Sequence, residues 1–298
     1  MFIVRPGVAA YNKLGDNMSG SSRKHYSRRR VLQSGGTAVT FGMLASAFGA
    51  LLPRGVRAAD SAAGVNALTI LYPAGEGLKF NKDYYRDHHL VTIMKLYGKT
   101  IERFELRTVN APPPPPPAAA PQAGAAAQPP RPPSYAAAIN IWIADLAAFQ
   151  ANNQKHGKTL QDDVPNFTNG MPVIQLDKVH GEMGAKRSAP KVGDTCLTIL
   201  YPNGEGVRWD VDYYRTGHMP LIMRLYGEKA IKRFELRKGD QNMAGGKADF
   251  IGSVNIYIAD QKAFDAAGKE HGNTLREDVP HFSSVLPNAF PSVIYGIG

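Results

Sequence analysis

The chain has 298 residues, of which 43% are hydrophobic, so it is long enough for two ordinary domains and too apolar to be disordered throughout. Its formal net charge is +10, but residues 1–59 hold nine Lys or Arg and one acid, against 26 and 24 in the rest of the chain. The rest therefore lacks a basic stripe, and we expect no nucleic-acid partner.

Residues 1–58 are laid out as a bacterial export signal. An arginine cluster that includes Arg28 and Arg29 precedes a modestly apolar run at 35–52, and a short stretch of basic and small residues ends at Ala58. This order predicts a twin-arginine signal peptide, cleaved after Ala58, that is recognised by the Tat export machinery. The expected location is periplasmic or secreted. A retained membrane anchor is the alternative, since about 18 apolar residues can just span a bilayer.

Two later parts of the chain repeat one another. Residues 68–98 align without gaps to residues 197–227, and 19 of the 31 positions are identical. Shared short motifs continue the match beyond these segments. Such a repeat predicts two similar domains, at 67–181 and 196–298, joined by a polar linker at 182–195.

The first repeat carries a Pro/Ala-rich insertion at 111–133, with six consecutive prolines at 112–117. Proline fixes φ and has no backbone N–H, so the insertion predicts an exposed polyproline-like loop. It is either a tolerated surface insertion or a ligand for an SH3-type domain. The second repeat makes the same connection with the polar segment 238–249, which we expect to be a loop.

Each repeat has the pattern strand, helix, strand, loop, strand, helix, strand. Capping residues mark the helix ends: Asn81, Asp210, Asp145 and Asp260 at the starts, and Gly98 and Gly227 at the ends of the first helices. The segment "RFELR" alternates charges that we expect to face outward with apolar residues that face inward. The pattern predicts an α+β fold of two ferredoxin-like (βαββαβ) repeats, packed sheet to sheet as a pseudo-dimer within one chain.

One face of the first helix carries the candidate catalytic residues. Steps of four place Tyr85, His89 and Tyr97 on a shared face, as they do Tyr214 and His218 in the second repeat. A half-buried imidazole can act as an acid or base near pH 7. The alternative is a core histidine that binds a strand carbonyl.

Other polar residues have weaker patterns. His156 and His271 on the second helices either cap carbonyls or line the rim of a pocket. The pairs Arg103/Glu105 and Arg233/Glu235 predict solvated or sheet-interface ion pairs rather than a catalytic dyad. The single cysteine, Cys196, predicts a buried strand residue, and no spacing of ligands predicts a metal site.

The motifs "LTILYP-GEG", "DYYR--H", "LYG", "RFELR" and "DVPNF/DVPHF" resemble those of the EthD family, named for a gene linked to ethyl tert-butyl ether degradation. The resemblance covers both repeats and implies the dimeric α/β-barrel superfamily, with a ligand cavity between each sheet and its helices. It implies an oxidoreductase, or a cofactor-independent enzyme. Haem is the alternative cofactor, because exported dye-decolourising peroxidases share the superfamily, but their G-x-x-D-G motif is missing here.

The expected function is that of an exported enzyme acting on a small hydrophobic, aromatic or carbonyl-type compound. His218 and His89 would be the acid/base, and Tyr72, Tyr85, Tyr201 and Tyr214 would line the cavity with His156 and His271. The segment His218-Met219-Pro220 matches the H-x-P usual in the family, which favours the second repeat. The alternative is a binding or carrier protein without catalysis. We expect a monomeric pseudo-dimer or a higher homo-oligomer.

Overall fold

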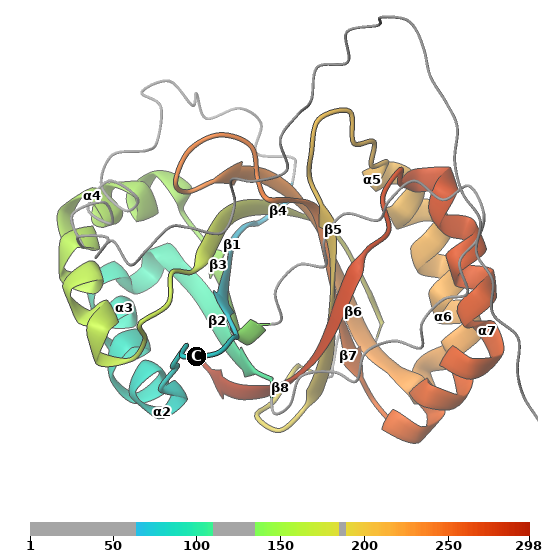
Figure 1. The fold of residues 1–298 in the computed structure, drawn as a ribbon, viewed down its shortest axis with the longest axis horizontal. Coiled ribbons are helices and arrows are strands. Elements are labelled where there is room, and N and C mark those ends of the chain that lie inside the picture. Colours follow the sequence, from blue (N-terminus) through green and yellow to red (C-terminus); the bar gives the residue numbers. More distant parts are fainter. Residues whose placement is uncertain (1–63, 110–134, 185–188) are drawn as a thin grey trace, which may run out of the picture. The chain divides into compact units, whose positions relative to one another are not determined.

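The computed structural model describes residues 64–109, 135–184 and 189–298. The predicted signal peptide at 1–58 and the insertion at 111–133 lie outside these residues. The described residues form a β-barrel with helices on its outer surface (Figure 1). None of the helices in these three ranges has the length and apolar character needed to cross a membrane.

The first half of the barrel follows the predicted element order, with short π and 3-10 turns added to the helices. Its elements are β1 (Asn66–Pro73), α2 (Lys82–Tyr84), η2 (Tyr85–His89), α3 (Leu90–Tyr97), η3 (Gly98–Thr100), β2 (Ile101–Thr108), β3 (Tyr135–Ile143), α4 (Leu146–Asp163), η4 (Val164–Asn166) and β4 (Val173–Gly184).

The second half repeats this order. Its elements are β5 (Thr195–Pro202), α5 (Val211–Tyr213), η5 (Tyr214–His218), α6 (Met219–Ala230), β6 (Ile231–Asn242), β7 (Phe250–Ile258), α7 (Gln261–Phe282) and β8 (Asn288–Ile297). Two predicted boundaries are wrong. Strand β4 runs on through 182–184, which were expected in the linker, and β6 extends to Asn242 into the expected loop 238–249.

Both predicted N-caps of the second helices are present. The Asp145 side chain accepts a hydrogen bond from the Ala148 N–H, and Asp260 accepts one from Ala263. Gly98 ends α3 with a φ of 53°, and Gly227 kinks α6 three residues before its end with a φ of 74°, a region that disfavours residues with a Cβ.

The strands close into one antiparallel barrel in the order β1-β3-β2-β8-β5-β7-β6-β4. The last strand of each half joins the halves, because β4 pairs with β1 and with β6, while β8 pairs with β5 and with β2. Every strand of this barrel therefore has two neighbours, and among the described strands none leaves an edge open to pair with another chain. The predicted α+β class is confirmed, and so is the closure of the two halves against each other within one chain.

The outer face of the barrel is apolar and packs against the helices. Its core in the first half joins strand residues such as Leu68, Ile139 and Leu106 to Leu90 and Ile93 of α3. A second cluster does the same in the second half, around Phe234, Ile256 and Phe282. These two clusters hold the helices, and hence the candidate histidines, in place.

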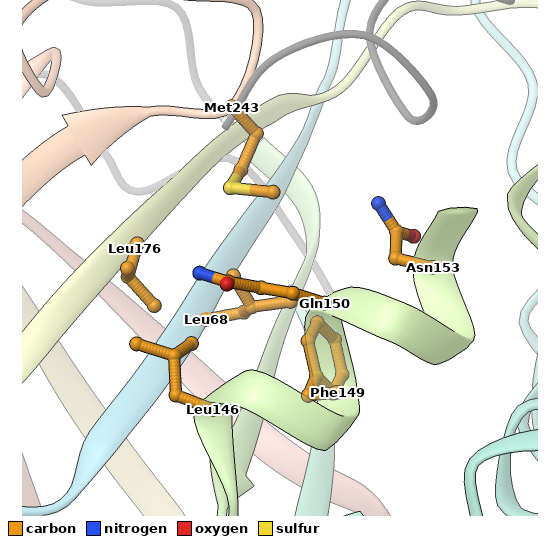
Figure 2. A pocket seen from close by; sticks show the side chains of 7 residues that line it. All are labelled: Leu68, Leu146, Phe149, Gln150, Asn153, Leu176 and Met243. Carbon is orange, nitrogen blue, oxygen red and sulfur yellow. The ribbon is translucent and has the colours of Figure 1, made fainter. Parts of the chain in front are cut away.

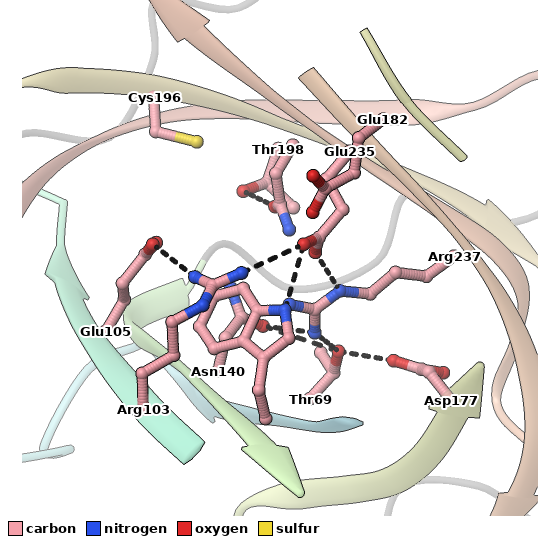
Figure 3. Close-up of polar contacts among 12 residues, drawn as sticks. Thr69, Arg103, Glu105, Asn140, Asp177, Glu182, Cys196, Thr198, Glu235 and Arg237 are labelled. Atoms are coloured by element: carbon pink, nitrogen blue, oxygen red, sulfur yellow. Dashed lines mark hydrogen bonds and ion pairs between the residues drawn. The ribbon is translucent and has the colours of Figure 1, made fainter. Parts of the chain in front are cut away.

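The inner face of the barrel is polar, which corrects the expected orientation of "RFELR". Glu105, Arg107, Glu235 and Arg237 are at most 2% exposed. They bond across the barrel rather than to solvent: Arg237 donates to Asn140 at 2.9 Å, and Trp142 Nε1 donates to Glu235 at 2.9 Å (Figure 3). Closure turns the charged face inward, where paired and hydrogen-bonded charges can be accommodated.

The ion pairs of this network make it continuous across the two halves. Arg237 Nε donates to Glu235 at 2.6 Å, and Arg103 of the first half reaches both Glu105 and Glu235. Burial alone would raise the pKa of Glu235, but Arg237 and Arg103 outweigh it and lower the pKa. The sheet-interface alternative for these pairs is thus the correct one. Cys196 is buried on β5, as predicted.

Candidate active site

The first helix of each half begins at a cap and then loosens into a π turn. Asn81 accepts from the Tyr84 N–H, and Asp210 accepts from the N–H groups of Asp212 and Tyr213. The Leu90 N–H then bonds to the Tyr85 carbonyl, five residues back, and Met219 bonds to Tyr214 in the same way. Such π turns are rare in proteins overall, but many of those that occur lie at functional sites. Each one ends on the candidate histidine.

A carboxylate of the second helix holds each of these histidines. His89 Nδ1 lies 2.8 Å from Asp163 Oδ2, and His218 Nδ1 lies 2.7 Å from Asp278 Oδ2. The second carboxylate oxygen accepts a bond from a tyrosine hydroxyl, Tyr84 at 2.7 Å in the first half and Tyr213 at 2.9 Å in the second. The two halves therefore repeat one Tyr–Asp–His arrangement.

The electrostatics favour a neutral imidazole in each half. Burial lowers the pKa of His89 and of His218, and the nearby Asp163 or Asp278 opposes this only in part. Burial would raise the pKa of Asp163, but hydrogen bonds from Asn166, Tyr84 and His89 lower it. An ionised carboxylate can only accept, so Nδ1 carries the proton and Nε2 has a free lone pair. This is the form of a general base.

Aromatic rings enclose each histidine. The Phe167 ring centre lies 4.6 Å from that of His89, and Tyr85 lies at 4.9 Å; Phe282 and Tyr214 have the same distances to His218. Tyr72 and Tyr201 pack on Tyr85 and Tyr214 in turn. Burial raises the pKa of these four tyrosines, which keeps their hydroxyls protonated. The structure thus brings together two predicted tyrosines and one predicted histidine in each half: Tyr72, Tyr85 and His89 in the first, and Tyr201, Tyr214 and His218 in the second.

The family resemblance implied a ligand cavity between each sheet and its helices, but the space found beneath α4 is far smaller than a ligand. Between the sheet and α4, the residues Leu68, Leu176, Phe149 and their neighbours enclose a cavity of about 10 Å³, the room of a single water (Figure 2). An open groove of about 390 Å³ lies instead beside the first-half site. Phe167 and Asn166 line this groove and also touch His89 and Asp163.

His156 and His271 are the predicted site residues that the structure does not bring to the others. Each lies in the middle of a second helix, two turns before Asp163 or Asp278, or about 10 Å along the axis. Both are half-exposed, and within the described ranges neither has a contact with His89 or His218. Neither lies at a helix end, so the expected capping of carbonyls does not apply.

The residues that hold the histidines were not predicted from the sequence. Asp163 and Asp278 were seen as part of the repeated "DVP-F" motif, without a partner. Tyr84 and Tyr213 were passed over for the tyrosines that follow them. The signal that could have found them is the repetition itself, because "DYYR", "H" and "DVP-F" recur together in both halves.

Comparisons with known proteins agree with part of the predicted resemblance. A search of curated protein sequences found no match. An EthD-like protein from Ralstonia eutropha JMP134 is 25% identical over 35% of this chain and 93% of its own, with a TM-score of 0.32. An anthrone oxidase-like protein is 7% identical over 80% and 94%, with a TM-score of 0.45.

A variant of chlorite dismutase from Candidatus Nitrospira defluvii is 8% identical over 78% of this chain and 92% of its own, with a TM-score of 0.40. The family comparison is more specific, because residues 76–170 match the model of the EthD domain. That segment contains Tyr84, His89 and Asp163, so the first-half site lies within a region similar to the EthD domain.

Proposed function

We propose that the protein is an EthD-like enzyme that uses histidine acid/base chemistry on a small hydrophobic or aromatic carbonyl compound. The observation that carries this proposal is the duplicated Tyr–Asp–His arrangement, in which a carboxylate fixes the proton on Nδ1 of His89 and of His218. A neutral imidazole with a free Nε2 can take a proton from a carbon next to a carbonyl group. Proton transfer of this kind requires no cofactor, and we propose that none, including haem, is needed.

Hydrogen–deuterium exchange tests this chemistry without knowledge of the natural substrate. The probe is 2-tetralone, an aromatic ketone whose α-protons exchange slowly in D₂O and are followed by NMR. We expect catalysed exchange with the protein, slower exchange with His89→Asn or His218→Asn, and background exchange with the double variant. The Asn amide can still donate to the aspartate, which protects folding. Full exchange by a folded double variant would reject the proposal.

The second candidate function is a carrier that binds a ligand without chemistry. The near-complete filling of the cavity beneath α4 and the open groove beside Phe167 favour ligand contact at the surface. Native mass spectrometry of protein purified from its own host would detect a bound organic molecule. A bound molecule together with no exchange activity favours carriage, and a Soret absorption band would indicate haem.

The architecture and location belong to the same proposal. We propose that each half is a ferredoxin-like EthD domain and that the two form a dimeric α/β-barrel within one chain, either monomeric or in a higher homo-oligomer. We further propose Tat-dependent export to the periplasm, for which Arg28 and Arg29 are the motivating residues. Replacing both by Lys should hold the protein in the cytoplasm in a fractionation experiment. Unchanged export would contradict this part.

A further inference from the structure

The groove beside the first-half site is formed by two segments that are tied together. Residues 79–81 and 165–169 line it. The Asn81 N–H donates to the Phe167 carbonyl at 2.7 Å, the Thr168 hydroxyl donates to the Lys79 carbonyl at 2.8 Å, and the Lys79 N–H donates to Asn169 at 2.7 Å. The groove is therefore preformed. Its volume lies within the range of small-molecule sites, about 300–1,000 Å³.

Phe80 supplies the apolar surface of the groove that a ligand can reach, because Phe167 is only 2% exposed. Phe80 is half-buried, and its ring centre lies 6.0 Å from that of Phe167 in an edge-to-face arrangement. Phe167 is in turn packed on His89. Leu78, next to the groove in the chain, is an exposed apolar residue. A flat ring laid on Phe80 would be separated from the imidazole by the Phe167 side chain.

One positive charge is available at the groove. Lys79 is the charged residue among the eight that line it, and within the described part of the chain it takes part in no ion pair. The neighbouring amides are occupied, because Asn166 donates to Asp163 and Asn169 donates to the Gly77 carbonyl. An ammonium group without a partner beside an apolar floor suits a carboxylate on an aromatic body.

In the second half, the residue equivalent to Lys79 already has hydrogen-bond partners within the protein. Arg208 stands where the first half has Lys79, and its guanidinium donates to the Pro280 carbonyl at 2.6 Å and to the His281 carbonyl at 3.1 Å. These bonds tie the guanidinium to the segment equivalent to residues 165–166, so the positive charge is used internally. Trp209, in the place of Phe80, adds bulk. The two halves thus share the Asp–His pair but differ at the groove.

We infer that the first-half groove binds a small aromatic carboxylate, with the ring on Phe80 and the carboxylate at Lys79. This inference rests on the proposed function only in taking the bound compound to be small and aromatic. It places the ligand in the first half, whereas the H-x-P motif at His218 favoured the second. Binding can be measured apart from turnover.

Calorimetric titration with 2-naphthoate, and with its neutral analogue 2-naphthamide, tests the inference. We expect one naphthoate per chain and weaker binding of the amide. Lys79→Met should weaken naphthoate binding about tenfold, the size of a charge-assisted hydrogen bond, and leave naphthamide unchanged. Lys99→Met removes an exposed lysine outside the groove and serves as the control with matched net charge. Equal binding of naphthoate by wild type and Lys79→Met would overturn the inference.

A variant designed to gain a second binding site provides an independent test of the inference. Arg208→Lys with Trp209→Phe gives the second half the lysine and the phenylalanine to which the first-half groove owes its charge and its exposed ring, so we expect two naphthoates per chain. A folded variant that still binds one would contradict the role given to Arg208. The results of this titration can be told apart from those of the exchange assay. Exchange of 2-tetralone without naphthoate binding overturns this inference alone, and naphthoate binding without exchange overturns the proposed function alone.

Discussion

His89 and His218 differ from ordinary core histidines in what holds them. A core histidine was expected to bind a strand carbonyl, but each of these binds an aspartate through Nδ1 and keeps Nε2 free of hydrogen bonds to described residues. The aspartate also takes a tyrosine hydroxyl, Tyr84 or Tyr213, which orients it. Each aspartate therefore acts as a positioning residue that fixes the tautomer and the direction of the ring.

Replacing both positioning aspartates should reduce activity more than stability. In Asp163→Asn/Asp278→Asn the amide can donate to Nδ1, which favours the opposite tautomer and removes the free lone pair from Nε2. We expect exchange of 2-tetralone to slow about 10²-fold or more, with the proton seen on Nε2 by ¹⁵N NMR. Asp162→Asn, at the exposed neighbour paired with Lys158, should leave both unchanged. An unaltered tautomer in the double variant would refute the positioning role.

The lowered pKa values of the two histidines predict a pH dependence of stability. The unfolded chain takes up protons near the ordinary value of 6.5, before the folded protein does. The contribution of the neutral histidines is thus fully present above pH 6.5 and is lost as the pH falls towards the folded pKa values. Melting temperatures measured from about pH 8 to about pH 5 should fall more steeply for wild type than for His89→Asn/His218→Asn.

The comparison of variants isolates the histidines from other groups that titrate in the same range. Asp177, for example, is buried in the barrel, which raises its pKa to about 6, and it is present in both proteins. Parallel melting curves for wild type and the double variant would contradict the predicted contribution of His89 and His218.

At the residue scale, the sequence predicted which side chains are buried together but not which carboxylates form hydrogen bonds to the histidines. The repeat and the i+4 spacing were enough to place Tyr85 beside His89. Asp163 lies 74 residues further on, and its direction depends on where α4 ends and how it crosses α3. Long-range pairing of this kind is not encoded in local spacing, so the second helix was assigned a histidine, His156, in place of its aspartate.

At the scale of elements, the caps were predictable and the π turns were not. Asn81 and Asp210 precede the helices by the local rule that a short polar side chain satisfies the first free N–H groups. The i+4 spacing of the candidate residues predicts a regular α-helix throughout. The π turns at η2 and η5 insert a wider turn just before each histidine, and no residue pattern of these five-residue segments identifies them.

Removal of the cap at α5 should weaken the second half and its site together. Asp210→Ala leaves the N–H groups of Asp212 and Tyr213 without their acceptor, and Tyr213 is the residue that holds Asp278. We expect the free energy of unfolding in urea to fall by about 1 kcal/mol. Asp212→Ala removes an exposed ion pair with Arg215 and should cost less. Equal losses from the two variants would show that the cap is not the cause.

At the scale of the whole molecule, the closed barrel decides what is inside. The alternation of "RFELR" was recognised, but its charges were expected to face solvent, as on a half-buried sheet. Closure is set by pairing of β4 with β6 and of β8 with β2, contacts that no local pattern contains. The same alternation then places Glu235 and Arg237 in the interior, where they join the two halves.

Breaking this network should destabilise the whole barrel. Glu235→Gln leaves Arg237 and Arg103 without their shared carboxylate, and we expect a loss of about 3–5 kcal/mol in the free energy of unfolding. Glu182→Gln, at an exposed partner of Arg233, should cost about 1 kcal/mol or less. Urea unfolding measures both. A loss for Glu235→Gln no greater than that for Glu182→Gln would show that the interior pairs do not join the halves.

The position of the two tryptophans gives the molecule a pair of intrinsic fluorescent reporters. Trp142 lies inside the barrel, bonded to Glu235 and covered by the Arg103 guanidinium at 3.4 Å. Trp209 lies among Tyr201 and Tyr214 in the second half. Emission from a Trp209→Phe variant would therefore follow the separation of the two halves, whereas emission from Trp142→Phe would follow the packing of helices on the second half.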